Sequence, residues 1–599
     1  MKKTPFNWRI AVLLIIFIIL FIVIICRLFY WQVLASEKLI KLAQSQYYSQ
    51  REILASRGEI FASDKFPLVT NQKAYLLFAS LSELKEPIDK LVSVLAPLFI
   101  FEEDIKATDS GEKSARGGST SGRKTKGEIT KERIMEKEEN LLETLSLKDL
   151  NWVILQHKVS EEVKEKITGL NLEGLGFEEE PIRFYPEASM AAQLLGFVGK
   201  NETGQNTGYF GLEGFYDMEL KGRRGLITQE TDVADRPILI GSFSNEKKKD
   251  GQSLILYFDR SIQFIVEKKL KKAVEKYKAK SGSVVIIDSQ TGGVISMAIF
   301  PSFDQREYYK YDKSLFKNSI ISDSYEPGST FKIFVMAAAI DKEVVKPETK
   351  CDICEKPLKM DKYEIKTWND EYYPDSTMTE VIEHSDNLGM VFVSQKLGID
   401  GFYEYLGKFG FGERTGIDLQ GETPCFLKHK KKWSEIDLAT ASFGQGIATT
   451  GIQMVRAAAV IANGGNLMDI HVVKEIISGN ERIEIKPKIT RGVIKPKTAK
   501  LIKKMMVQAV EKGEAKYLKI PGYKIAGKTG TAQIPVAGHY DEEKTIASFI
   551  GFAPADKPKF VMLVKLREPK TSPWGSETAA PLFFSIAKDL FTYYGIQPD

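Results

Sequence analysis

The sequence predicts an α+β protein in which helices pack on an antiparallel sheet, preceded by one membrane-spanning helix. Strand patterns and helix patterns occur in separate runs, which favours α+β layers over alternating βαβ units. An uncharged apolar run lies close to the N-terminus. The chain has 599 residues, of which 43% are hydrophobic, so it can form several domains of roughly 100–200 residues each.

The apolar run extends from Ile10 to Cys26 and contains no charge, proline or glycine. Its length is close to the roughly 17–25 residues of a membrane-spanning helix and exceeds the core of a cleavable signal. A buried core helix is the alternative. Because Lys2, Lys3 and Arg9 precede the run, the positive-inside rule predicts a cytoplasmic N-terminus and an extracytoplasmic remainder.

Charge and cysteine content exclude little else. The net charge of +5 is small for 599 residues, so it predicts no nucleic-acid partner. Cys351 and Cys354 form a lone C-x-x-C pair, which is half of a tetrahedral zinc site. A local disulfide or two free thiols is the favoured interpretation, and a redox or metal role is the alternative.

The first half of the chain contains two shifts in composition. Residues 103–139 have almost no large apolar side chains, so we expect a disordered or solvated insertion. Residues 244–254, SNEKKKDGQSL, form a charged linker. In the preceding region, YLLFASLSELK at 75–85 is typical of a strand followed by a helix.

The second half begins with a strand, SLILYFD, and a helical segment at 261–280. Alternating strands follow at 282–300, and Thr291-Gly292-Gly293 predicts the hairpin turn between them. Near the C-terminus, residues 545–568 predict two further strands joined by a Pro/Asp turn, and residues 578–595 predict a closing amphipathic helix.

Residues 522–533, GYKIAGKTGTAQ, match two motifs. Gly522 to Thr529 satisfies the phosphate-binding pattern G-x-x-x-x-G-K-[ST], while Lys528-Thr529-Gly530 is the K-T-G element of penicillin-recognising serine enzymes. A phosphate-binding loop opens a helix, but Gly, Thr and Pro follow Lys528 and argue against a helix there. An extracytoplasmic domain also lacks an ATP supply. We therefore interpret the segment as K-T-G.

The K-T-G element requires an S-x-x-K upstream. Ser329-Thr-Phe-Lys332 follows the Pro327-Gly328 turn and leads into a strongly apolar helix, where both side chains would project from one face. Other matches lack this context, among them those that begin at Ser82, Ser121, Ser244 and Ser314.

The base for Ser329 is not expected to be histidine, because the chain has only five histidines and no G-x-S-x-G elbow. Lys332 can act as the base if burial and the nearby Lys528 cation favour its neutral amine. The third element, S-x-N, is Ser385-Asp386-Asn387, between two helical segments; Ser478-Gly479-Asn480 also matches but is typical of a β-turn.

With these three motifs in order, the chain resembles a class B penicillin-binding protein, a monofunctional peptidoglycan D,D-transpeptidase. The similarity extends over nearly the whole length. SRGEIFASD, RFYPEASMAAQLLGFVG and GLEGFYDMELKGRRG resemble boxes of the family's N-terminal pedestal, while PSFD, ASFGQGIATTGIQMVRAAAVIANGG and PWGSETAAPLF resemble its catalytic domain. Two departures are Ser-Asp-Asn in place of Ser-Ser-Asn and the insertion in the pedestal.

The resemblance implies an elongated α+β pedestal and a penicillin-binding, β-lactamase-like transpeptidase domain with an antiparallel sheet flanked by helices. The expected organisation is a cytoplasmic tail at 1–9, an anchor at 10–30, a pedestal at 31–245 and a transpeptidase domain at 250–599. The insertion at about 103–139 interrupts the pedestal.

The resemblance also implies the catalytic roles. Ser329 would attack the carbonyl between the two terminal D-alanines of a stem peptide, with Lys332 as general base. Ser385 would relay a proton to the leaving D-alanine. Asn387 would orient the acyl amide and Lys332.

On the K-T-G strand, the resemblance assigns Lys528 to catalysis and Thr529, Gly530 and Thr531 to substrate binding, with the terminal carboxylate as their target. The backbone N–H groups of Ser329 and Thr531 would form the oxyanion hole. No metal or organic cofactor is implied. The implied partners are stem peptides ending in D-Ala-D-Ala, β-lactam antibiotics, the membrane and a membrane glycosyltransferase of the SEDS type.

Rival functions share these motifs. A D,D-carboxypeptidase or a serine β-lactamase is the alternative within the enzyme class, and rapid hydrolysis of bound penicillin would indicate the lactamase. A β-lactam sensor or a silent scaffold is the alternative outside it. A sensor needs a signalling domain inside the cell, whereas only about nine residues precede the apolar run. The sequence leaves open a role in cell shape or in cell division.

Overall fold

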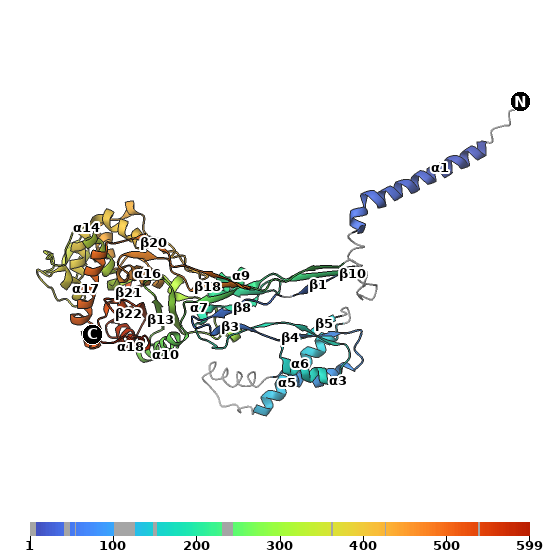
Figure 1. The fold of residues 1–599 in the computed structure, drawn as a ribbon, viewed down its shortest axis with the longest axis horizontal. Coiled ribbons are helices and arrows are strands. Elements are labelled where there is room, and N and C mark those ends of the chain that lie inside the picture. Colours follow the sequence, from blue (N-terminus) through green and yellow to red (C-terminus); the bar gives the residue numbers. More distant parts are fainter. Residues whose placement is uncertain are drawn as a thin grey trace. The chain divides into compact units, whose positions relative to one another are not determined.

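The computed structural model describes residues 8–40, 48–53, 55–100, 126–147, 152–230, 243–360, 363–425, 427–536 and 539–598. The chain forms two compact units. One combines Met1–Arg57 with Lys221–Gly251, and the other combines Gly58–Leu220 with Gln252–Asp599. Figure 1 labels some of the helices and strands of both units.

The first unit contains the N-terminal helix. Helix α1 (Trp8–Phe29) continues into a π-helical turn, η1 (Tyr30–Leu34). An 18-residue stretch within Trp8–Leu34 has a mean hydropathy of 3.4, and none of that stretch is buried in the protein. This length and composition suffice to cross a membrane. The unit also contains a three-stranded antiparallel sheet in the order β1 (Tyr48–Ile53), β10 (Gly225–Glu230) and β11 (Phe243–Glu246).

In the second unit, a small α/β layer follows the first strands. Its sheet has the order β5 (Trp152–Val159), β4 (Tyr75–Ser80) and β6 (Leu175–Glu179). Three helices share its hydrophobic core: α3 (Ile88–Leu95), α5 (Lys126–Leu145) and α6 (Glu161–Gly169).

Helix α5 corrects the predicted disordered insertion. The prediction over 103–139 is wrong for residues 126–139, which are helical; the rest of that range lies outside the described residues. The helix is mostly polar, but Ile134, Leu141 and Leu145 recur at helical spacing and pack into the core of the α/β layer. A single apolar stripe is enough to anchor a helix by tertiary packing.

A six-stranded sheet joins early and late parts of the chain. Strand β12 (Ser253–Leu256) pairs in parallel with β2 (Ile60–Phe61) and antiparallel with β18 (Val473–Ser478). The remaining strands are β3 (Pro67–Gln72), β7 (Ile182–Phe184) and β19 (Glu481–Glu484). The Ser478–Asn480 segment forms the β18–β19 hairpin, as its sequence predicts.

A five-stranded antiparallel sheet with longer strands lies between the two main hydrophobic cores, and both of its faces are buried. Its order is β14 (Val294–Phe300), β13 (Ser281–Ile287), β23 (Phe560–Arg567), β22 (His539–Ala553) and β21 (Ala526–Val536). The predicted turn at 291–293 connects β13 and β14. These observations confirm the α+β prediction and place the K-T-G segment on the edge strand β21.

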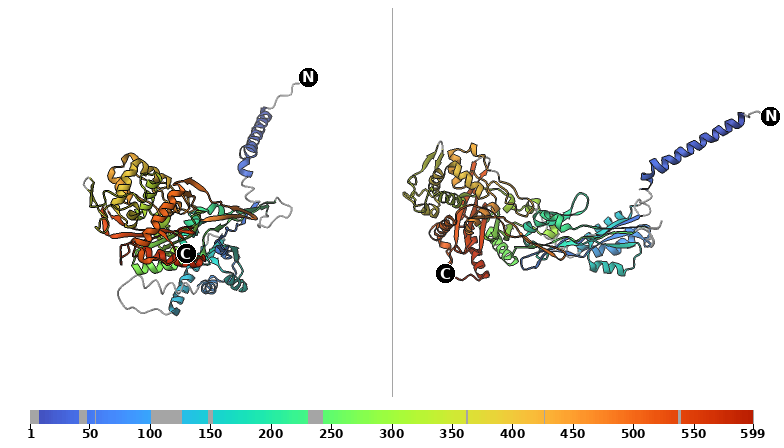
Figure 2. Two further views of the ribbon diagram at one scale, coloured as in Figure 1. Left: turned by 60° about the vertical axis from the view of Figure 1, so that its left-hand side comes forward. Right: turned by 45° about the horizontal axis from the view of Figure 1, so that its top comes forward.

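Side chains alternate between the two faces of this sheet, as the two-residue repeat of a strand requires. Val284 and Ile286 pack in one core with α10 (Arg260–Tyr277) and α18 (Ala579–Tyr593), which is the predicted closing helix. Figure 2 shows these two helices close together beside the sheet. Val285 and Ile287 pack in the other core. That core contains α11 (Ser319–Ser322), α12 (Lys332–Asp341), α14 (Asn387–Lys408), α16 (Gly451–Ala462) and α17 (Pro496–Lys512).

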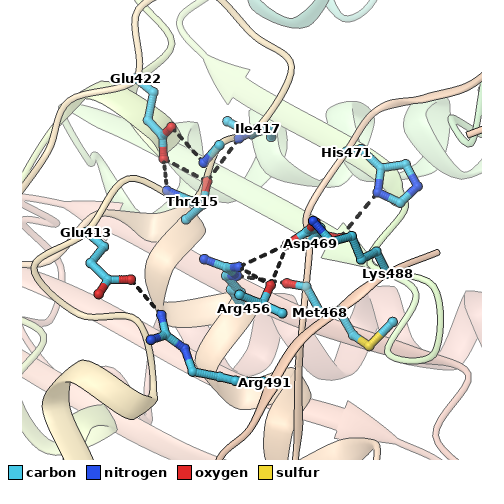
Figure 3. A network of polar contacts seen from close by, with 12 residues as sticks. Glu413, Thr415, Ile417, Glu422, Arg456, Met468, Asp469, His471, Lys488 and Arg491 are labelled. Atoms are coloured by element: carbon cyan, nitrogen blue, oxygen red, sulfur yellow. Dashed lines mark hydrogen bonds and ion pairs between the residues drawn. The ribbon is translucent and has the colours of Figure 1, made fainter. Parts of the chain in front are cut away.

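Helix α16 packs on one face of this sheet, and a polar network connects it to neighbouring strands (Figure 3). Arg456 is 4% exposed, and its Nε donates to the Met468 carbonyl at 2.8 Å. Its Nη2 donates to Thr490 Oγ1 at 3.0 Å and lies 3.6 Å from Asp469. These contacts tie α16 to the strand pair β17 (Asn466–Met468) and β20 (Ile489–Gly492).

A buried ion pair supports the junction around β3 and β7. Arg183 Nε donates to Glu213 Oε1 at 2.6 Å, and the two side chains are 5% and 0% exposed. Arg183 also donates to Asn71 on β3 at 3.0 Å. Such a pair is costly to break, because the remaining partner is left as a buried charge.

We therefore expect Glu213→Gln to destabilise the protein by roughly 3–5 kcal/mol, because the Arg183 guanidinium loses its counter-charge. Urea denaturation followed by tryptophan fluorescence measures the change. Glu162→Gln is the control, since it breaks an exposed pair with Lys166 and should leave the midpoint unchanged. Equal midpoints for the two variants would contradict the prediction.

Candidate active site

Ser329 lies in a 3₁₀ turn, η5 (Gly328–Phe331), which leads directly into α12. Side chains three residues apart eclipse in a 3₁₀ helix, so the turn places Ser329 and Lys332 on one face. Ser329 is partly exposed, whereas Lys332 is fully buried. The predicted nucleophile is therefore accessible and its predicted base is withdrawn from water.

The S-x-N segment holds the Lys332 amine. It connects α13 (Met378–Glu383) to α14, as its sequence predicts. Lys332 Nζ donates to the Ser385 carbonyl at 2.6 Å and to Asn387 Oδ1 at 2.8 Å, and Ser385 Oγ lies 3.4 Å away. Ser385 adopts a φ of 57°, an uncommon conformation for a side chain other than glycine and one that often occurs at functional sites.

The middle residue of this segment, Asp386, caps α14. Its Oδ1 accepts the Leu388 N–H at 2.8 Å, and the side chain is buried. Aspartate is a preferred N-cap because its carboxylate satisfies a free backbone donor of the first turn. The departure from Ser-Ser-Asn therefore has a structural role in this chain.

The K-T-G segment lies on β21, packed against η5. We call η5 the nucleophile turn, after the predicted role of Ser329. Gly530 allows this contact, because a Cβ there would lie 2.7 Å from both Ser548 Oγ and Thr330 Cγ2. A Cβ on Gly328 would lie 3.0 Å from the Thr531 carbonyl oxygen. The structure thus brings together all three motifs that the sequence analysis selected.

Lys528 and the two threonines of β21 make different hydrogen bonds. Lys528 is buried, and its Nζ donates to Thr529 Oγ1 at 3.0 Å. Thr531 Oγ1 instead accepts the backbone N–H of Gly575 at 2.9 Å. A hydroxyl has one hydrogen to donate, so accepting this bond leaves the hydrogen of Thr531 available.

Burial and charge set the protonation of the two lysines. Burial, followed by the neighbouring Lys528 cation, lowers the pKa of Lys332 to about 7, while the charges of Asp386 and Glu514 oppose this shift. Burial also lowers the pKa of Lys528, again opposed by Glu514. Near neutral pH a substantial fraction of Lys332 is therefore a neutral amine that can accept a proton.

Comparison with known proteins identifies the family. Residues 282–590, more than half of the chain, match the family described as "Penicillin binding protein transpeptidase domain". Residues 52–256 match the family described as "Penicillin-binding Protein dimerisation domain". The chain belongs to the class B penicillin-binding proteins. Its matched segments contain every site residue that the sequence analysis named.

Relatives and solved structures agree with this assignment. The penicillin-binding protein is 31% identical over 595 residues to stage V sporulation protein D of Bacillus subtilis (strain 168), covering 98% of this chain and 86% of that protein. It is 27% identical to the peptidoglycan D,D-transpeptidase FtsI of Buchnera aphidicola, covering 100% of this chain and 97% of that protein.

Two solved structures show the same fold. A peptidoglycan synthetase from Bifidobacterium adolescentis has a TM-score of 0.70 at 24% identity, covering 92% of this chain and 98% of that chain. Penicillin binding protein 3 from Mycobacterium tuberculosis, complexed with aztreonam, has a TM-score of 0.66 at 23% identity with the same two coverages.

The structure adds contacts that the motifs alone do not reveal. A backbone hydrogen bond holds the nucleophile turn, because the Gly328 N–H donates to the Gly444 carbonyl at 3.1 Å. A Cβ on Gly444 would lie 2.2 Å from the Gly328 carbonyl oxygen. The rings of Trp368 and Trp574 pack edge to face, with their centroids 5.2 Å apart. Gly444 and Trp574 lie in sequence boxes that resemble the family, whereas Trp368 has no such signal.

Two further features concern the surroundings of the site. Glu514 Oε2 accepts the Thr529 hydroxyl at 2.8 Å, and nothing in the sequence pattern singles out this glutamate. Cys351 and Cys354 form a disulfide, which is the local link among the alternatives. Both cysteines are buried, and the Cys351 N–H donates to the Ser376 carbonyl at 2.9 Å.

Removing the second lysine should change the first. We expect Lys528→Met to raise the pKa of Lys332 by roughly one unit, because a neighbouring positive charge no longer opposes protonation. NMR titration of ε-¹³C-lysine in the purified penicillin-binding protein measures this, with the resonance assigned by its absence in Lys332→Arg.

Lys565→Met provides a matched control, since Lys565 is also buried and its pKa is lowered to about 8. Lys565→Met should leave the pKa of Lys332 unchanged. An unchanged or lowered pKa of Lys332 in Lys528→Met would show that the two amines do not interact as the geometry indicates.

Proposed function

We propose that this protein is a peptidoglycan D,D-transpeptidase that cross-links stem peptides through an acyl-enzyme on Ser329. The observation that carries the proposal is the buried Lys332 amine, which is held by Ser385 and Asn387 one 3₁₀ turn from the serine. Its pKa of about 7 suits a general base at neutral pH. The names of the relatives support the same activity.

In the acylation step, Ser329 Oγ attacks the carbonyl carbon between the two terminal D-alanines of a stem peptide, and its proton passes to Lys332. The resulting oxyanion accepts hydrogen bonds from the backbone N–H groups of Ser329 and Thr531, each worth roughly 3–4 kcal/mol in other serine enzymes. The C–N bond then breaks. The leaving D-alanine amine takes up the proton, relayed by Ser385.

Substrate orientation depends on the edge strand. Lys528 and the Thr531 hydroxyl bind the terminal carboxylate of the donor peptide, whereas the Thr529 hydroxyl already donates its hydrogen to Glu514. Gly530 lets the strand approach the nucleophile turn. Asn387 contributes twice, because its Oδ1 accepts from Lys332 while its Nδ2 donates to the Lys366 carbonyl at 2.9 Å. The amide is therefore held in the orientation that fixes the base.

In the second step, the amine of a neighbouring stem peptide attacks the acyl carbon, the Ser329 ester bond breaks and the cross-link forms. A β-lactam acylates the same serine and leaves it slowly. Slow release distinguishes this function from a β-lactamase, and use of an amine rather than water as acceptor distinguishes it from a D,D-carboxypeptidase.

The proposed setting is a single-pass position in the cytoplasmic membrane. Helix α1 is the anchor, and Lys2, Lys3 and Arg9 favour a cytoplasmic N-terminus. Residues 31–245 form the pedestal and residues 250–599 the transpeptidase domain, both extracytoplasmic. The proposed partner is a membrane glycosyltransferase of the SEDS type, contacted by the anchor and the pedestal. Copurification in mild detergent tests this partner, and its absence under conditions that retain known pairs would count against it.

The first experiment is labelling of the full-length protein with a fluorescent penicillin. Ser329→Ala should abolish the covalent adduct, because the acylated oxygen is gone. Ser314→Ala should keep wild-type labelling, since Ser314 begins a decoy S-x-x-K and is exposed in another 3₁₀ turn, η4 (Lys313–Phe316). A folded wild-type protein that forms no adduct would favour a silent scaffold.

The labelling rate should also depend on pH. Because Lys332 must be neutral to accept the serine proton, and its pKa is about 7, the second-order rate constant should fall as the pH decreases through about 7. Stopped-flow or gel-based kinetics between pH 5.5 and 8, as roughly chosen limits around that value, measure this. A rate independent of pH across that range would exclude Lys332 as the base.

A further inference from the structure

Glu514 contacts the site from outside the three motifs. It follows α17 and precedes a short 3₁₀ turn, η7 (Lys516–Leu518). Both neighbours of Glu514 are closely packed. The backbone at Gly513 lies so near α13 that a Cβ there would be 2.6 Å from the Glu383 carbonyl oxygen, and Ala515 is buried. The Glu514 carboxylate is thereby held against β21.

A chain of two hydrogen bonds connects this carboxylate to the buried ammonium. Lys528 Nζ donates to Thr529 Oγ1 at 3.0 Å, and Thr529 Oγ1 donates to Glu514 Oε2 at 2.8 Å. The single hydrogen of Thr529 is therefore directed at Glu514. The Thr529 hydroxyl is left as an acceptor for Lys528.

Electrostatics gives this chain a consequence. The proposed reaction needs Lys332 neutral and Lys528 charged, yet burial disfavours the charged form of both. The charged groups acting on Lys332 are Lys528, Asp386 and Glu514, and His384 acts in turn on Asp386. At Lys528, Glu514 is the one charged group among the described residues that opposes burial.

We propose that Glu514 is a positioning residue of the active site, which through Thr529 holds Lys528 in place as a cation and so keeps the two buried lysines in opposite charge states. Glu514 does not touch the reacting atoms. This role rests on the proposed function, because the need for opposite charges comes from acylation of Ser329.

The test is the pH profile of acylation by a fluorescent penicillin, measured on full-length Glu514→Gln in detergent. Glutamine keeps a carbonyl acceptor for Thr529 and removes only the charge. Because Glu514 raises the pKa of both lysines, its loss should move both the acid limb and the alkaline limb to lower pH, by roughly half to one unit. On the alkaline limb the rate constant should therefore fall about three- to tenfold.

Two variants complete the design. Glu511→Gln removes the same charge from the last turn of α17 and should reproduce the wild-type profile. Glu514→Asp keeps the charge and should restore both limbs toward wild-type positions. Thermal melting of each variant verifies that it is folded.

The outcomes separate this inference from the proposed function. A wild-type protein that is not acylated overturns the proposed function. If the wild-type protein is acylated but both limbs of the Glu514→Gln pH profile keep their wild-type positions, the role of Glu514 is overturned. This holds even if the rate constant falls equally at every pH, because a uniform loss indicates a merely structural contact. Equal displacement in Glu514→Asp and Glu514→Gln would also overturn it.

Discussion

The organisation of the active site depends on the burial of one lysine amine. Lys332 is fully enclosed, and desolvation is the largest influence on its charge. A buried ammonium is costly without compensation, and the protein compensates with hydrogen-bond acceptors, the Ser385 carbonyl and Asn387 Oδ1, which suit a neutral amine as well as a charged one. The neighbouring Lys528 cation adds to the effect of burial in lowering the pKa of Lys332, while the charges of Asp386 and Glu514 oppose it. The chemistry therefore follows from where the chain can exclude water.

The fold produces this exclusion through two packed cores. Helix α12 is buried along its whole length, so a lysine at its first position has no route to solvent. The nucleophile turn precedes it and rests on β21, where Gly530 allows a close approach. Gly444, outside β21, allows its own backbone to approach Gly328 of the turn. Ser329 is partly exposed in this turn, whereas Lys332, at the start of the helix that follows, is enclosed. Exposure of the predicted nucleophile, Ser329, and burial of its predicted base, Lys332, thus arise from one short change of helix type.

The sequence predicted the elements that carry strong local signals. Hairpin turns, the apolar helix after Pro327-Gly328 and the order of the three motifs all depend on neighbouring residues, and the structure contains them. Helix α5 was missed because its stabilising contacts come from a distant core, which composition does not register. Asp386 could be recognised as a motif residue but not as a helix cap.

Glu514 shows the limit of sequence reasoning most clearly. It lies 15 residues before Thr529, in a loop without a recognisable pattern, and only the packing of α17 against β21 brings it to the site. A single glutamate in a chain with 79 acidic residues has no distinguishing mark. The roles of the motif residues come from resemblance to a family and stay predictions until labelling and kinetics test them.

The parallel pairing of β2 with β12 has a consequence for biogenesis. Ile60 and Phe61 pair with Leu254 and Ile255, and β12 pairs in turn with β18. Strand β2 can pair at once with the nearby β3, but its other edge has no partner until a much later segment has been synthesised and exported, so this sheet cannot mature in step with translocation. Until then its edge remains open to other chains. A fragment that begins at the charged linker would lack β2, so the edge of β12 that β2 covers would stay open permanently.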